Sequence, residues 1–273
     1  RLPKHWSKDP KGDVKRLVKA LYGLRVSPRR WFDTYRSFLE SRGWEMCSRE
    51  PGLFRRGKML LSVYVDDTII AGPNRDEVNA EMKLILARFS GSVIDPVLDG
   101  NVEIRDILGA TLRYDRVNRT MKISVENAIK KTLERFHMSD CKPIATPVER
   151  GFDPAGGKEN STFPIRELVG VFQYLAMVCR PDITFAVQRI ARLTTKCTDN
   201  TVRAGKYILR YLKGTLDVGL EYSPDIESEF RRVYSEVAKA GDKDGNLGNT
   251  ISFSDADFMG CQVTLKSTSG SIM

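Results

Sequence analysis

Apolar residues recur at helical spacing in several separate stretches of the chain. The spacing predicts a helix over Val14–Leu24. Ser27 and Pro28 are a capping residue followed by proline at the first helical position, and they predict a second helix over Arg29–Ser41. Gly43 ends that pattern. Further helices are predicted from an Asn74 cap through Met82 to Phe89, over Glu126–Phe136, and as three helices within Ile165–Gly214.

Short runs of apolar and β-branched residues predict strands between these helices. Leu53–Arg55, Met59–Val65 and Thr68–Ala71 follow one another closely, and Asp66 and Asp67 lie between the last two runs. This pattern is typical of a β-hairpin with an acidic turn. Further strands are predicted over Ile107–Tyr114, Met121–Val125, Val218–Tyr222 and Thr250–Ser254. Because helices and strands mix without strict βαβ repetition, the sequence favours an α+β fold over a doubly wound sheet.

The stretch from Lys142 to Pro164 is rich in proline and glycine and shows no apolar periodicity. Such a composition is typical of a linker, so the first domain is expected to end there. We predict a first domain over 1–148, a linker over 149–164, a helical region over 165–248 and a last part over 249–273. The polar stretch within 225–248 carries no pattern that assigns an element.

Positive charge is concentrated near the start of the chain. The 273 residues carry a formal net charge of +9, and residues 1–60 contain 16 Lys and Arg against 6 Asp and Glu. Aromatic residues are also frequent there, namely Trp6, Tyr22, Trp31, Phe32, Tyr35 and Trp44. A basic and aromatic segment indicates a surface for a polyanion such as nucleic acid. A solvated basic helix face is the alternative.

Several classes of protein are disfavoured by the sequence. The longest mainly apolar stretch, Met59–Gly72, is interrupted by Asp66 and Asp67 and falls short of the roughly 18–20 residues that a membrane span needs. The start of the chain has no apolar signal region, so secretion is not expected. The five cysteines are scattered, odd in number and without a C-x-x-C pair, which indicates reduced thiols in an intracellular protein.

Asp66 and Asp67 are the residues best suited to chemistry. Neighbouring side chains in a strand point to opposite faces, whereas at a turn both carboxylates can converge on one point. Carboxylate oxygens are preferred ligands of Mg²⁺. Two such ions about 3.5–4 Å apart can activate a 3′-hydroxyl and hold an in-line phosphoryl transfer. An ordinary polar turn is the alternative, since Asp is common in turns for backbone reasons.

Five blocks of sequence, spread over nearly the whole chain, form an ordered set of motifs. They are Leu17–Phe32 (LVKALYGLRVSPRRWF), Ser62–Gly72 (SVYVDDTIIAG), Ile107–Val148, Glu167–Tyr222 and Ser254–Ser271 (SDADFMGCQVTLKSTSGS). Taken in order, these blocks resemble the reverse transcriptase of copia-type retrotransposons. The second block is similar to the active-site hairpin of that family, the fourth to its helical connection, and the fifth to the opening of its ribonuclease H domain.

The resemblance implies an RNA-directed DNA polymerase that uses an RNA template, a DNA primer and deoxynucleoside triphosphates. It implies a palm-like sheet with packed helices, a helical thumb and connection region, and a partial ribonuclease H start. Asp66 and Asp67 would be catalytic and would bind Mg²⁺, or Mn²⁺ in its place. The remainder of a Pol polyprotein would be a further partner. The protein would act in the cytoplasm, within a virus-like particle, or in the nucleus.

The resemblance also implies residues that position the substrates. Gly23, Ser27 and Pro28 match the Gly-x-x-x-Ser-Pro spacing by which reverse transcriptases place the template strand and the incoming nucleotide. Tyr64 would pack against the primer end, with an ordinary strand aromatic as the alternative.

Three arginines close to this motif would bind phosphates. By the resemblance, Arg25, Arg29 and Arg30 would contact the template backbone or the triphosphate of the nucleotide. A solvated position is the alternative for each of them.

The chain also departs from the family pattern at its acidic residues. A third active-site carboxylate of the family lies on a strand well before the Leu-Tyr-Gly block, and Asp13 precedes Gly23 too closely to take its place. Asp255 matches only the first of four carboxylates that ribonuclease H uses. A catalytically inactive nucleic-acid-binding remnant is therefore the alternative to an active polymerase, and a ribonuclease would rest on Asp255 alone.

Overall fold

The structure divides the chain into two compact units. The computed structural model describes residues 18–241, 253–256 and 269–272. The first unit extends to Val93, and the second begins at Ile94. This boundary lies well before residue 148, where the sequence predicted the end of the first domain. Among the described helices, none combines the length and the apolar character that a membrane span requires.

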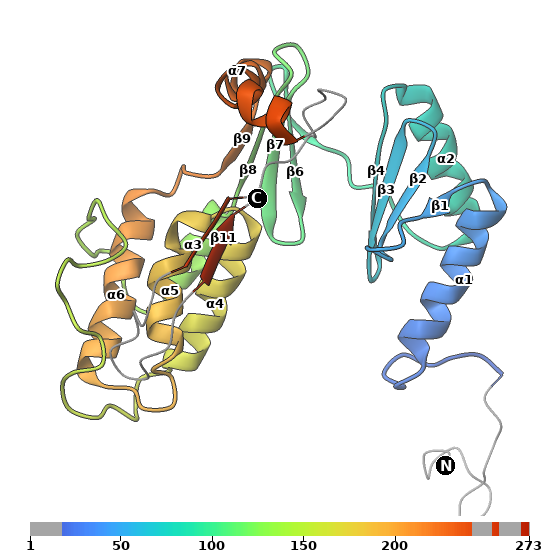
Figure 1. Cartoon of the computed structure of the whole chain (residues 1–273). Coiled ribbons are helices and arrows are strands. Elements are labelled where there is room, and N and C mark those ends of the chain that lie inside the picture. Colours follow the sequence, from blue (N-terminus) through green and yellow to red (C-terminus); the bar gives the residue numbers. More distant parts are fainter. Residues whose placement is uncertain (1–17, 242–252, 257–268, 273) are drawn as a thin grey trace, which may run out of the picture. The chain divides into compact units, whose positions relative to one another are not determined.

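The first unit consists of a four-stranded antiparallel sheet and two helices (Figure 1). Its elements are α1 (Ser27–Ser41), β1 (Glu45–Met46), β2 (Leu53–Arg56), β3 (Met59–Tyr64), β4 (Asp67–Ala71) and α2 (Arg75–Arg88). The strand order is β1-β2-β3-β4, and every neighbouring pair is antiparallel. The predicted hairpin is confirmed, and so is the Asn74 cap, whose side chain accepts from the N–H groups of Asp76 and Glu77.

Both helices pack on the same face of this sheet. In β3 every second residue, Met59, Leu61 and Val63, is buried, and the residues between them are exposed, as the two-residue period of a strand requires. The buried side chains form one cluster with Tyr35 of α1 and Ile85 of α2. The opposite face of β3 is therefore open to solvent.

A buried carboxylate joins α2 to the carboxyl end of α1. Glu81 of α2 is 1% exposed, and its Oε1 accepts from Trp44 Nε1 at 3.0 Å and from Arg42 Nε at 3.1 Å. Arg56 of β2 forms an ion pair with Oε2 at 2.8 Å, and its guanidinium lies over the Trp44 ring. Burial raises the pKa of Glu81, but these bonds and charges outweigh burial and hold the pKa below its usual range.

The second unit contains a five-stranded antiparallel sheet and a set of helices. Its elements are β5 (Val97–Asp99), β6 (Val102–Ile107), β7 (Ala110–Asp115), β8 (Thr120–Ser124), α3 (Glu126–Arg135), α4 (Ile165–Val178), the short helix η2 (Pro181–Ile183), α5 (Thr184–Ala191), α6 (Asp199–Gly214), β9 (Leu220–Tyr222), α7 (Pro224–Gly241), β10 (Phe253–Ala256) and β11 (Ser269–Ile272). Strand β9 pairs with β8 only after the chain has passed through α3–α6. The predicted α+β class is confirmed.

The stretch predicted as a linker packs against α6 within the second unit. The hydroxyl of Thr198, which caps α6, donates to the Gly156 carbonyl at 2.6 Å. Arg203 of α6 forms an ion pair with Glu149 at 2.8 Å. Residues 149–164 form no helix or strand, yet side chains of α6 satisfy their polar groups, so this stretch is a packed strap.

The predicted helix over Val14–Leu24 is wrong where the structure describes it. From residue 18 onward the chain forms turns and bends, and Gly23 has a φ of +87°. Val18 is 95% exposed and Tyr22 is fully exposed, so these two side chains pack against nothing in the described residues. Apolar spacing does not stabilise a short helix that has no partner surface.

Ser27 has a different role from the predicted cap. Its hydroxyl donates to the Leu21 carbonyl at 2.5 Å instead of accepting from a helix N–H, and Val26 takes the cap position. Helix α1 nevertheless ends where Gly43 predicted, because this residue has a φ of +81°, which favours glycine.

One expectation for the second unit is corrected, and the stretch without an assignment contains a helix. The predicted strand over Ile107–Tyr114 is interrupted, since Leu108 and Gly109 have positive φ angles of 52° and 83° and form the turn between β6 and β7. Helix α7 occupies most of the stretch that carried no assignment. Ser223 accepts from the Ile226 N–H at 3.1 Å just before this helix. A serine-proline pair followed by acidic residues was the signal that marks its start.

The Glu81 cluster generates a prediction about stability. Glu81→Gln leaves Arg42 and Arg56 without a carboxylate, and we expect it to lower the free energy of unfolding of the first unit by about 2–3 kcal/mol at neutral pH. The pKa of Glu81 is lowered in the folded protein, so its contribution is present above the ordinary glutamate pKa and is lost as the pH falls. The difference between the two proteins should therefore shrink in acid.

Urea unfolding from neutral pH to pH 3 measures this difference. Glu40→Gln is the matched control, because Glu40 forms an exposed ion pair with Arg36 at 2.7 Å, and we expect a loss below about 0.5 kcal/mol. Equal losses for Glu81→Gln and Glu40→Gln would contradict the role of the cluster.

Candidate functional site

The two adjacent carboxylates lie at the turn between β3 and β4. Tyr64 pairs with Asp67 as the last residues of the hairpin ladder, so Val65 and Asp66 form a two-residue turn. We call Tyr64, Val65, Asp66 and Asp67 the acidic turn. All four side chains are exposed. Val65 has a φ of 53°, a left-handed conformation that a β-branched residue rarely adopts.

The strand register decides which face of the sheet each side chain of the acidic turn uses. Tyr64 and Asp67 are cross-strand partners, and so are Val63 and Thr68. Paired residues point to the same face and successive residues to opposite faces. Val63 is buried beneath the helices, so Thr68 faces α1, whereas Tyr64 and Asp67 share the open face.

Helix α1 contacts the hairpin directly beside the acidic turn. The Tyr35 hydroxyl lies 3.0 Å from the Thr68 hydroxyl, within hydrogen-bonding distance. The ring of Trp31, one helical turn closer to the amino end, stacks on Tyr35 at 5.2 Å. The carboxyl end of α1 lies at the other end of the sheet, where Trp44 contacts Arg56 beside the β2–β3 turn. The amino end of α1 is therefore at the same end of the unit as the acidic turn, and Figure 1 shows it extending beyond the sheet.

The residues of the predicted substrate motif lie at this amino end. Ser27 is buried, and Gly23 and Pro28 are exposed. The bond from Ser27 to the Leu21 carbonyl closes the segment before α1 onto the first turn of the helix. The structure thus gives the Gly-x-x-x-Ser-Pro motif a local role, in which Ser27 fixes the entry of the chain into α1.

The three candidate arginines are exposed at the same end of the helix. Arg29 lies 3.9 Å from Asp33, a loose pair between two exposed side chains. Within the described residues, Arg25 and Arg30 take part in no ion pair. A helix amino end attracts anions, and these guanidinium groups add positive charge there. This end of the first unit is suited to a phosphate-bearing ligand.

Asp66 and Asp67 have the donor chemistry that a hard divalent cation prefers. Both are exposed, and neither takes part in an ion pair within the described part of the chain. Carboxylate oxygens at a solvent-accessible turn suit Mg²⁺ or Mn²⁺. Across the described ranges, no group of three or more His, Cys, Asp or Glu side chains is placed to hold a metal. The structure therefore supplies two adjacent acidic ligands at the turn.

The remaining acidic candidates are not brought to this turn by any described contact. Asp13 lies outside the described residues. The backbone of Asp255 pairs with Gly270 between β10 and β11. The ribonuclease H assignment of Asp255 stays a prediction.

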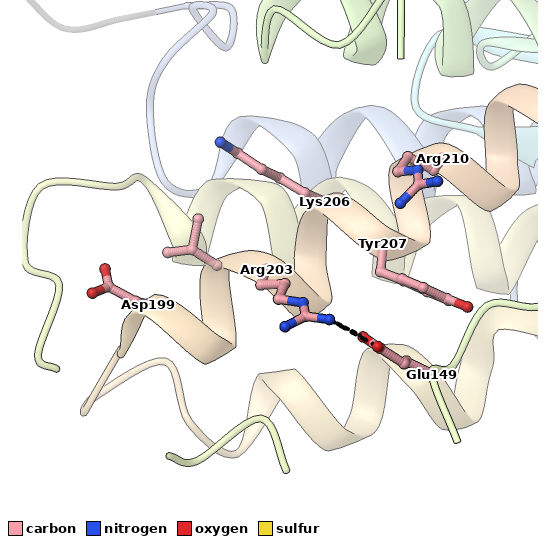
Figure 2. Close-up of a pocket in the computed structure, with 7 residues that line it drawn as sticks. Glu149, Asp199, Arg203, Lys206, Tyr207 and Arg210 are labelled. Atoms are coloured by element: carbon pink, nitrogen blue, oxygen red, sulfur yellow. Dashed lines mark hydrogen bonds and ion pairs between the residues drawn. The ribbon is translucent and has the colours of Figure 1, made fainter. Parts of the chain in front are cut away.

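A second basic site lies on α6 in the second unit. A pocket of ≈320 Å³ is lined by Glu149, Asp199, Val202, Arg203, Lys206, Tyr207 and Arg210. Figure 2 shows Arg203 reaching to Glu149 and Lys206 pointing away from that pair. Arg210 Nε donates to the Lys142 carbonyl at 2.7 Å, and Lys213 Nζ donates to the Ser139 carbonyl. Much of this basic face therefore holds the preceding chain segment in place.

Sequence reasoning did not identify Tyr35 and Thr68, which meet on the helix-covered face of the sheet beside the acidic turn. In the sequence, Tyr35 belongs to the predicted helix over Arg29–Ser41 and Thr68 to a predicted strand. They are 33 positions apart, and no local pattern joins them. The available signal was Thr68 itself, a polar residue at a strand position that the apolar alternation assigns to the buried face.

Comparisons with known proteins place these residues in a family context. The model of the reverse transcriptase (RNA-dependent DNA polymerase) family matches residues 3–150. This range includes the acidic turn, α1 and the arginines at its amino end. No solved structure matches the chain.

Three curated relatives are Pol polyproteins of plant transposons. The chain is 30% identical over 253 residues to the retrovirus-related Pol polyprotein from transposon TNT 1-94 of Nicotiana tabacum, an alignment that covers 87% of this chain and 18% of that protein. It is 32% identical over 244 residues to the polyprotein from transposon RE1 of Arabidopsis thaliana, covering 87% and 16%. For transposon RE2 of the same plant the identity is 30% over 273 residues, covering 97% and 17%. The chain thus spans less than a fifth of these relatives.

The backbone of the acidic turn generates a second prediction. Val65→Gly removes a β-branched side chain from a left-handed position, and we expect the free energy of unfolding to rise by about 0.5–1 kcal/mol. Leu60→Gly is the control, because Leu60 is an exposed β3 residue without a positive φ, and there glycine should cost about 1 kcal/mol. Chemical unfolding measures both changes. A loss of stability in both variants would contradict the left-handed turn.

Proposed function

The chain belongs to the reverse transcriptase (RNA-dependent DNA polymerase) family of copia-type retrotransposons, and from this we propose that its first unit carries part of the catalytic centre for nucleotide transfer onto a DNA primer along an RNA template. The observation that carries the proposal is the exposed pair Asp66 and Asp67 at the hairpin turn, at the same end of the unit as the arginine-bearing amino end of α1. We further propose that the chain is part of a Pol polyprotein, as the three plant transposon proteins compared above are.

Asp66 and Asp67 would hold Mg²⁺, or Mn²⁺ in its place. The chemistry that such ions would supply, when bound, is a lowered pKa of the primer 3′-hydroxyl and neutralised charge on the transferred phosphate. Tyr64 shares the open face with Asp67, so its exposed ring is available to pack against the terminal base of the primer. The acidic turn thereby fixes both the metal ligands and the position of the reacting hydroxyl.

The arginines at the amino end of α1 bind phosphates in this proposal. Arg25, Arg29 and Arg30 are exposed, and a guanidinium group can donate two parallel hydrogen bonds to a phosphate. The amino end of α1 contributes unpaired backbone N–H groups and a positive dipole. Together they would hold the template backbone or the triphosphate of a deoxynucleotide beside the acidic turn.

Two carboxylates are an incomplete set for two metal ions. We therefore expect the isolated chain to show little or no primer extension, and a protein that also carries the preceding part of its reading frame to extend a primer efficiently. If the extended protein were inactive as well, the chain would be a nucleic-acid-binding remnant.

A third prediction tests the acidic turn in the extended protein. Asp66→Asn or Asp67→Asn should lower kcat by several orders of magnitude, because each change removes a charged metal ligand. The Kd for primer and template should change little, since the arginines provide the binding. Single-nucleotide primer extension on an RNA template measures kcat, and fluorescence anisotropy measures the Kd.

The matched control is Asp76→Asn on α2, which removes an exposed carboxylate of the same unit. It should leave kcat within about twofold. Unchanged turnover in both acidic-turn variants would remove the hairpin from the active site.

A fourth prediction concerns the salt dependence of nucleic-acid binding. Replacing Arg25, Arg29 and Arg30 together with Gln should lower the slope of log Kd against log salt by about two units, since each phosphate contact contributes roughly 0.7–0.9. The effect should depend little on base sequence. Anisotropy of a labelled RNA–DNA hybrid between low and moderate salt measures the slope, and circular dichroism checks the fold.

The control for this prediction removes the same charge elsewhere. Replacing Lys130, Lys131 and Arg135 with Gln changes three exposed positions of α3 in the second unit. Its slope should match that of the unmodified chain. Equal slopes for both triple variants would mean that the three arginines are a solvated face.

A further inference from the structure

The hydrogen bond between Tyr35 and Thr68 lies directly behind the acidic turn. Thr68 follows Asp67 in β4, and its hydroxyl meets the Tyr35 hydroxyl at 3.0 Å on the face that the helices cover. Tyr35 is 2% exposed. The bond therefore joins the middle of α1 to the residue adjacent to a predicted metal ligand.

The surroundings of Tyr35 leave its ring little freedom to move. Trp31 stacks on it at 5.2 Å with an angle of 10° between the rings, and Phe89 packs against it at 5.0 Å. Helix α1 is itself fixed at its carboxyl end, where Arg42 and Trp44 bind Glu81. A hydroxyl held by such packing can fix the position of its partner.

A polar pair at this place has a geometric consequence that an apolar pair would lack. A phenylalanine facing a valine would fill a similar volume without the cost of burying two hydroxyls. A hydrogen bond, unlike an apolar contact, requires a defined distance and angle. It therefore fixes the position of β4 along α1 at the point where β4 enters the acidic turn.

We infer that Tyr35 and Thr68 are positioning residues for the reaction, which hold the acidic turn so that Asp66 and Asp67 present their carboxylates in the geometry that nucleotide transfer requires. The inference rests on the proposed function of the acidic turn. Neither residue touches the reacting atoms in this scheme. Their effect is transmitted through the short peptide link from Thr68 to Asp67, and a displacement of about 1 Å at such a site lowers the rate strongly.

The test combines a kinetic and a structural measurement. In the extended protein, Tyr35→Phe and Thr68→Val should each lower kcat about tenfold while the KM for nucleotide and the Kd for primer and template stay unchanged. Thr68→Ser keeps the hydroxyl and should restore most of the rate. The double variant should be no slower than either single variant, because both remove the same bond.

Tyr174→Phe provides the matched control. Tyr174 lies in the second unit, and its hydroxyl donates to the Leu108 carbonyl at 2.8 Å, so this change also removes one tyrosine hydrogen bond. It should leave kcat unchanged. In the chain itself, amide hydrogen exchange of residues 65–68 should speed up in Tyr35→Phe and stay the same in Tyr174→Phe.

The outcomes separate this inference from the proposed function. If Asp66→Asn and Asp67→Asn stop extension while Tyr35→Phe matches Tyr174→Phe in kcat, the positioning role is wrong and the active site stands. If Thr68→Ser is as slow as Thr68→Val, the hydroxyl does not matter and the inference also fails. If the aspartate variants remain active, the acidic turn is not catalytic and both proposals fall.

Discussion

The buried carboxylate of Glu81 is the constraint on which the geometry of the first unit depends. A charged group at 1% exposure is tolerated only when partners of opposite charge or hydrogen-bond donors compensate it, and three side chains from two other segments do so: Arg42 and Trp44 donate to Oε1, and Arg56 forms an ion pair with Oε2. Arg42 and Trp44 follow α1, and Arg56 ends β2. One side chain of α2, itself paired with Arg56 of β2, thus fixes the carboxyl end of α1 against the sheet, and α1 cannot slide along the strands without breaking the contacts of Arg42 and Trp44.

Because α1 is fixed on one face of the sheet, the alternation of side chains along the hairpin decides which of them contact α1 and which face solvent. Thr68 faces Tyr35 on the helix side, and Asp67 faces solvent beside Tyr64 on the open side. A slip of one residue in the β3–β4 register would exchange these faces and bury Asp67 under α1. The β3–β4 register that buries the apolar core therefore also places Asp67 on the open face. The acidic turn takes up its position when the sheet folds.

The sequence predicted the parts that local patterns determine. Most of α1 and α2, the β3–β4 hairpin and the helices α3–α6 follow from apolar spacing, caps and turn residues over a few neighbouring positions. The failures have two physical sources. Residues 18–24 repeat apolar spacing without a surface that buries Val18 and Tyr22, and Glu81 and Tyr35 act through partners 25 or more positions away that no local pattern specifies. The acidic turn was therefore predictable, whereas the side chains that hold it were not.

The two units use positive charge in different ways. On α6 of the second unit, Arg203 is paired with Glu149, and Arg210 and Lys213 donate to backbone carbonyls of the segment that precedes α4. These cations hold the segment from Ser139 to Glu149, which forms no helix or strand of its own to satisfy its polar groups. At the amino end of α1, by contrast, the arginines are exposed and make at most a loose ion pair within the described residues. Charge that is not used for folding is available for a ligand, and in the described chain it lies at the same end of the first unit as the acidic turn.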